Sequence, residues 1–121
     1  LELAGLAPPA DWEAQSLLPA LMDPAGPAAA GREVVFAEQA RDGILTDTAM
    51  MTMVRTREWK LVHYLEQEDG ELYDLRADPG ERRNLWASPE HTPRREALLA
   101  TLRDWLIRSN LRAGDWSAPW R

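Results

Sequence analysis

The chain has 121 residues, a length that suits one small domain or part of a larger protein. Its net charge is −6 and its 14 Lys and Arg are scattered, whereas nucleic-acid phosphates require a basic stripe, so no nucleic-acid partner is expected. No apolar run approaches the roughly 18 residues of a membrane span, so no membrane partner is expected either. Without Cys the chain offers no disulfide and no Cys-based zinc site, and its cellular location stays unassigned.

The first 31 residues are expected to be a linking segment with little regular structure. The chain starts without Met, a basic region or a long apolar region, so this start is not a signal peptide. Residues 1–6 are typical of the end of an amphipathic helix stopped by Pro8 and Pro9, which indicates a fragment. A short helical turn is expected over residues 15–22, before a loop rich in Pro and Gly at residues 23–31.

Alternating and mixed apolar residues predict four strands. The expected strands are residues 32–39, 51–56, 59–65 and 71–75. A loop over Ala40–Thr48 separates the first two, and Asp69-Gly70 is a strong signal for a hairpin turn before the fourth. The connections after the second strand are short, so strands two, three and four are predicted to be antiparallel.

The last third of the chain predicts a helix. Leu98, Leu102 and Trp105 recur at helical spacing and form an apolar stripe, with Thr92 as the expected cap and Pro93 at the first position. Asn110 and Gly114 are the candidate ends. The predicted fold class is therefore α+β: a four-stranded antiparallel sheet with a C-terminal helix packed on one face and short helical segments at the N-terminus.

A dense turn follows the fourth strand. Asp78, Pro79 and Gly80 combine a side-chain cap, a fixed φ and a permissive glycine. Asn84 tolerates unusual backbone angles and is expected to hold the corner by hydrogen bonds to the backbone. The stretch from Gly70 to Trp86 is therefore predicted to have a structural role, with Leu72 or Tyr73 entering the core.

Several ordered blocks of sequence resemble the C-terminal part of the type I sulfatases, in the alkaline-phosphatase-like superfamily. The blocks are "MVRTREWKLVHYL", "GELYDLRADPGERRNL" and "LLATLRDWL". The start, "LELAGLAPP…SLLP", is similar to the family's segment that joins the large catalytic domain to this small one, although Ala14-Gln15 replaces the usual Gly-Arg/Lys. The resemblance implies a linking segment at residues 1–31, the sulfatase C-terminal subdomain at 32–112 and a tail at 113–121.

The resemblance also implies that the chemistry lies elsewhere in a parent enzyme. In the family, a formylglycine nucleophile and a calcium ion are held by the large domain. No catalytic or metal-binding residue and no cofactor is therefore expected in this chain, which is predicted to be inactive alone. Ser117 to Arg121 match the pattern Ser-x-Pro-x-Arg, but nothing follows them, so they are interpreted as a tail.

Five residues are candidates for the rim of a substrate cleft: Arg41, Asp42, Asp47, Lys60 and His63. The first three lie in the loop between the first two strands, and loops of this subdomain can border the cleft in the family. A solvated lysine, a packed histidine and a plain surface loop are the competing interpretations.

The expected function is to complete the fold and border the substrate cleft of an enzyme that hydrolyses sulfate esters. The alternatives are the same subdomain of a phosphonate monoester or phosphodiester hydrolase, and a free-standing binding module without catalysis. A sheet with one covering helix also has too many apolar residues for a wet second face. These residues are Val34, Phe36, Met51, Met53, Val54, Leu61, Val62 and Tyr64. They predict a surface that docks the large catalytic domain and that self-associates when the chain is alone.

Overall fold

The computed structural model describes residues 1–9, 12–42 and 47–113 of the chain. It divides into two compact units, one formed by residues 33–107 and the other by residues 1–32 together with the chain from Arg108 onward. The larger unit contains the sheet and most of the long helix.

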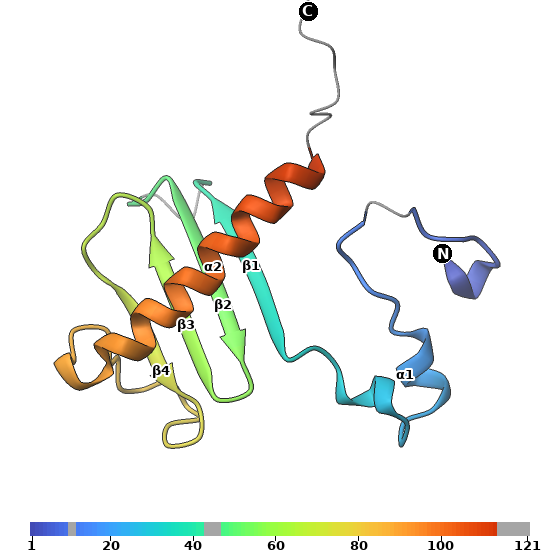
Figure 1. The fold of residues 1–121 in the computed structure, drawn as a ribbon, viewed down its shortest axis with the longest axis horizontal. Helices are drawn as coiled ribbons and strands as arrows, with labels where there is room; N and C mark the ends of the chain where they lie inside the picture. Colours follow the sequence, from blue (N-terminus) through green and yellow to red (C-terminus); the bar gives the residue numbers. More distant parts are fainter. Residues whose placement is uncertain (10–11, 43–46, 114–121) are drawn as a thin grey trace, which may run out of the picture. The chain divides into compact units, whose positions relative to one another are not determined.

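The sheet is an antiparallel meander. Its strands are β1 (Val34–Ala40), β2 (Met50–Thr56), β3 (Trp59–Tyr64) and β4 (Gly70–Asp74). They pair in sequence order, each antiparallel to the next (Figure 1). The four predicted strands are confirmed; β1 begins two residues later than expected, and every other strand end lies within one residue of its predicted position.

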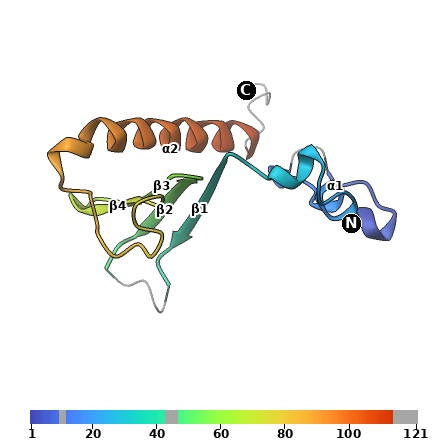
Figure 2. The same cartoon turned by 90° about the horizontal axis from the view of Figure 1, so that it is seen from below.

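Helix α2 (Thr92–Ala113) lies over one face of this sheet, as Figure 2 shows. The core forms between them: Val54, Leu61 and Leu72 from three adjacent strands are fully buried, and they meet Leu98 and Leu102 from the helix. At the outer strand, the Phe36 and Trp105 rings stack with their centroids 4.6 Å apart. The α+β fold class is confirmed, because the stripe on α2 and the inner residues of the strands complete one core.

The strand register divides the eight apolar residues that are too many for a sheet with one wet face into two equal sets. Phe36 pairs with Val54 and Val54 with Leu61, so these residues share the face that α2 covers, together with Val34. The remaining members lie on the opposite face: Met51, Met53, Val62 and Tyr64. The eight residues therefore supply both faces of the sheet, because side chains alternate between the two faces of a strand, and α2 covers one of these faces. The same alternation places Leu72 in the core and Tyr73 on the opposite face.

The corner after β4 closes the outer edge of that strand. The Asn84 side chain accepts a hydrogen bond from the Leu72 N–H at 3.0 Å and donates one to the Gly70 carbonyl at 2.8 Å. The Leu85 N–H then donates to the Leu72 carbonyl at 2.8 Å. The predicted role of Asn84 is confirmed: it satisfies an edge that would otherwise expose unpaired backbone groups.

Two local predictions in this corner and helix are wrong. The left-handed residue of the turn is Glu81, with φ 53°, rather than Gly80 or Asn84. Thr92 is not a cap but a helical residue, with φ −51° and ψ −47°, because the short 3-10 turn η3 (Pro89–His91) already begins after Ser88 and leads into α2. The helix also continues past Asn110 to Ala113, and Gly114 lies outside the described residues.

The smaller unit has short helical turns: η1 (Glu2–Ala4), α1 (Leu18–Met22) and η2 (Pro27–Ala30). The first is a 3-10 turn rather than the end of an α-helix, and it stops at Gly5, whose φ is 72°. Most large apolar side chains of the smaller unit are exposed, including Leu3 at 83% and Leu17 at 74%. In the described part of the chain, no helix is long and apolar enough to cross a membrane.

Candidate functional site

Three of the predicted rim residues gather at one end of the sheet, which we call the loop end. It is formed by the β1–β2 loop, described at residues 41–42 and 47–49, and the β3–β4 turn at residues 65–69. The Arg41 N–H donates to the Ala49 carbonyl at 2.9 Å. The Gln67 side chain donates to the Asp47 carbonyl at 3.0 Å, so the loop and the turn are in contact.

The side chains of the loop end are largely carboxylates. Arg41, Asp42 and Asp47 are exposed, and the Asp42 carboxylate accepts a hydrogen bond from the Gln39 amide at 3.0 Å. Glu66, Glu68 and Asp69 of the adjoining turn are also exposed. Carboxylates accept hydrogen bonds from hydroxyl and N–H groups but repel anions, so this end of the sheet suits neutral hydrogen-bond donors.

His63 is the last but one residue of β3, beside the loop end, on the face that α2 covers. It is half-buried and pairs with Thr52 across the strands. The Thr52 hydroxyl is buried and has no hydrogen-bond partner among the described residues, which costs about 1–3 kcal/mol. Sequence reasoning missed this group because a Thr in a β-strand is ordinarily a packing residue.

Lys60 is separated from the other candidates. It lies near the opposite end of β3 and on the opposite face, where its ammonium group is 2.5 Å from the Glu81 carboxylate. Arg55 approaches the same carboxylate at 3.9 Å. The left-handed backbone of Glu81 aims its side chain at these two cations, so Lys60 is an ion-pair residue in this structure. Sequence reasoning missed Glu81, because nothing local indicates which cation 21 residues away it meets.

Tyr64 and Glu71 form a second polar pair on that same face. The Tyr64 hydroxyl donates to the Glu71 carboxylate at 2.6 Å. This hydrogen bond, together with burial and the negative charge of Glu71, raises the pKa of Tyr64 to about 12. Burial and the Glu71 charge also raise the pKa of Tyr73. Both phenols therefore stay protonated at neutral pH and cannot act as bases there.

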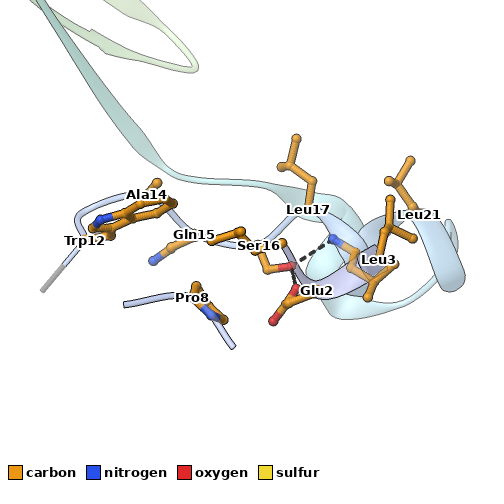
Figure 3. A pocket seen from close by; sticks show the side chains of 11 residues that line it. Glu2, Leu3, Pro8, Trp12, Ala14, Gln15, Ser16, Leu17 and Leu21 are labelled. Atoms are coloured by element: carbon orange, nitrogen blue, oxygen red, sulfur yellow. Dashed lines mark hydrogen bonds between the residues drawn. The ribbon is translucent and has the colours of Figure 1, made fainter. Parts of the chain in front are cut away.

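A pocket of about 300 Å³ lies in the smaller unit, between η1 and the segment that leads into α1 (Figure 3). Leu3, Leu17 and Trp12 are among its apolar lining residues. Its polar groups bind one another: the Ser16 hydroxyl donates to the Glu2 carboxylate and accepts from the Leu18 N–H at 3.1 Å. No histidine is among its described lining residues, so the pocket lacks a Ser–His pair.

The implied calcium ion and formylglycine do not fit the residues that are described. Among residues 1–9, 12–42 and 47–113, no group of three or more His, Asp or Glu side chains could hold a metal ion. The sequence contains no Cys, and the Ser117 motif lies outside the described residues. No step of a hydrolytic reaction can be assigned to this part of the chain.

The fold and the corner define a small α+β subdomain of the kind that ends sulfatases. The chain matches the family model described as N-sulphoglucosamine sulphohydrolase, C-terminal, over residues 1–108, and it belongs to this family. It is 34% identical over 108 residues to a Delta 4,5-hexuronate-2-O-sulfatase of Bacteroides thetaiotaomicron. That match covers 89% of this chain and 22% of the relative.

Solved structures share the fold. A 2-O GAG sulfatase superposes with a TM-score of 0.72 at 33% identity, covering 90% of this chain and 23% of the other. A phosphonate monoester hydrolase from Silicibacter pomeroyi has a TM-score of 0.60 at 22% identity, covering 95% and 24%, a likeness of fold alone. The chain thus spans less than a quarter of the proteins it resembles.

Proposed function

We propose that the chain is the C-terminal subdomain of a sulfatase that hydrolyses sulfate esters of saccharides, and that it completes the fold of that enzyme. The family match over residues 1–108 carries the proposal. The substrate class follows from relatives named for uronate 2-O-sulfate and for glycosaminoglycan sulfate. Formylglycine and calcium would belong to the larger N-terminal part, since the described residues do not hold them.

We further propose that the loop end borders the substrate cleft through Arg41, Asp42, Asp47 and, beside them, His63. These residues would contact hydroxyl groups of the sugar rather than its sulfate, because carboxylates dominate this end of the sheet. Lys60 is left out of this role because Glu81 neutralises it at the other end of β3.

The domain boundaries remain part of the proposal: a linking segment at 1–31, the subdomain at 32–112 and a tail at 113–121. The exposed apolar residues of the linking segment, such as Leu3 and Leu17, fit a strand of chain that packs against another domain.

Activity of the full-length polypeptide from the same gene tests the function. We expect it to release sulfate from 2-O-sulfated unsaturated uronates faster than it hydrolyses a phosphonate monoester. Asp42→Ala should raise KM for the saccharide without changing turnover of a small aryl sulfate, which does not reach the rim. Faster phosphonate turnover would instead favour the phosphonate hydrolase, and absence of any hydrolase region in the gene would favour a free-standing binding module.

A further inference from the structure

The sheet face turned away from α2 has the composition of an interior surface. We call it the outer sheet face, and its apolar residues are Val35, Ala37, Met51, Met53, Val62 and Tyr64. Val62, on the inner strand β3, is only 5% exposed, whereas Val35 on the edge strand β1 is 37% exposed. If the outer sheet face met only water, each strand would alternate apolar residues on the covered face with polar residues on the outer sheet face.

Within the larger unit, no described helix or strand covers this face (Figure 2). The corner loop reaches it through the Glu81 carboxylate, which contacts Lys60 and Arg55. In Figure 2 α2 lies on the other side of the sheet along its whole width. Sheets in α+β domains need a covering layer wherever a face is apolar. Within the larger unit, the described residues therefore give the outer sheet face no covering layer.

The charged side chains on the outer sheet face neutralise one another. Glu81 takes both cations, Arg55 and Lys60, and the Glu71 carboxylate accepts the Tyr64 hydroxyl. Together Arg55, Lys60, Glu71 and Glu81 sum to zero net charge. Covering the face would thus leave no lone charge buried, which is the costly outcome at an interface. A sulfated saccharide, by contrast, would find no net positive charge to attract it.

The backbone of Glu81 supports the same conclusion. A non-glycine residue in the left-handed region costs roughly 1–2 kcal/mol, yet Glu81 adopts φ 53° next to a glycine that does not. The strain is retained where it places a carboxylate between two cations on this face. A strained backbone of this kind persists only where several surrounding interactions hold it in place.

We propose that the outer sheet face is the surface against which the larger, N-terminal part of the full-length sulfatase packs. This inference rests on the proposed function, because it takes the rest of a sulfatase chain as the occupant. The matched relatives extend several times beyond this subdomain, which covers 22% of one and 23% of another. Covalent linkage gives that part an effective concentration near millimolar, which favours it over a second copy of this chain.

Cysteine footprinting tests the inference, since the chain has no Cys of its own. Ala37→Cys and Met53→Cys place single thiols on the outer sheet face, and Arg103→Cys places a matched thiol on the exposed side of α2. Labelling by a maleimide is measured by mass on the corresponding peptide, in the 121-residue chain and in the full-length polypeptide. Unchanged circular dichroism verifies the fold of each variant.

We expect both outer-face thiols to label in the 121-residue chain at low concentration, and to label at least about tenfold more slowly in the full-length protein, because thiol reactivity requires access. Arg103→Cys should label equally in both. Equal labelling of Ala37→Cys and Met53→Cys in both proteins would overturn the inference. Protection that appears in the short chain as its concentration rises would also overturn it, by assigning the face to a second copy. Sulfatase activity of the full-length protein is measured separately, so loss of the proposed function and loss of the docking surface give different results.

Discussion

Gly70 is required for space rather than for backbone freedom. A Cβ at this position would lie 2.6–2.7 Å from atoms of the Trp86 ring, while Gly70 itself sits in β4 without a positive φ. Trp86 is held there, because its indole N–H donates to the Glu68 carbonyl at 2.9 Å. The ring therefore cannot move away without losing a hydrogen bond.

Gly70→Ala should accordingly destabilise the fold by about 1–3 kcal/mol through overpacking. Gly80→Ala is the matched control: the nearest atom to its Cβ is the flexible Arg82 Nε at 3.3 Å, and a change within about 0.5 kcal/mol is expected. Urea denaturation midpoints measure both. Equal effects of the two substitutions would mean that Trp86 is free to relax.

Asn84 connects the corner to the edge of β4 through its side-chain oxygen and nitrogen. Asn84→Ala leaves the Leu72 N–H and the Gly70 carbonyl without these partners, so we expect a loss of about 1–2 kcal/mol. Asn84→Asp keeps the acceptor for Leu72 and for the Trp86 N–H but loses the donor to Gly70, so its loss should be smaller. Hydrogen exchange at the Leu72 amide checks the assignment, since protection should fall in the alanine variant and persist in the aspartate variant.

At the scale of elements, the layer between the sheet and α2 carries the stability of the larger unit. Leu72 is 0% exposed and belongs to the cluster with Leu61 and Leu98. Leu72→Ala should cost about 2–5 kcal/mol through lost burial and a cavity. Val35→Ala, on the outer sheet face, removes a side chain that is 37% exposed and should cost far less. An unchanged denaturation midpoint for Leu72→Ala would contradict its place in the core.

The hydrogen bond between Tyr64 of β3 and Glu71 of β4 predicts that the stability of the fold decreases at alkaline pH. The hydrogen bond to Glu71 raises the pKa of Tyr64 above its ordinary 10.0 to about 12 in the folded chain. Below pH 10 the phenol is protonated in both states and its contribution is fully present. Between pH 10 and 12 the unfolded chain loses this proton first, so stability falls as the pH rises. Tyr64→Phe should remove this part of the decline in stability, which thermal denaturation measures between pH 10 and 12. An identical decline in both proteins would contradict this role of Tyr64.

For the whole molecule, the absence of a catalytic group among the described residues predicts inactivity. The purified 121-residue chain should hydrolyse neither aryl sulfates nor aryl phosphates, with or without calcium, because no metal site is found in the described chain. Ser117→Ala serves as the control for the tail motif. Turnover that this substitution abolishes would make Ser117 a nucleophile, and turnover that survives it would place the chemistry elsewhere in the chain.

The sequence by itself determined the elements, the meander and the family. Alternating residues in β2 and β3, short turns and the stripe of Leu98, Leu102 and Trp105 are local patterns, and each element expresses them directly. The roles of Leu72 and Asn84 could also be predicted, because strand alternation and the chemistry of a corner depend on near neighbours.

Only the tertiary structure decided which distant groups meet. Glu81 reaches Lys60, Trp86 covers Gly70, and Gln67 meets the loop at Asp47, all across 16 to 21 residues of sequence. These contacts depend on how the strands and the corner pack, and packing is not encoded in local periodicity. For this reason the sequence grouped Lys60 with the other candidate rim residues, whereas the fold places it in an ion pair on the outer sheet face.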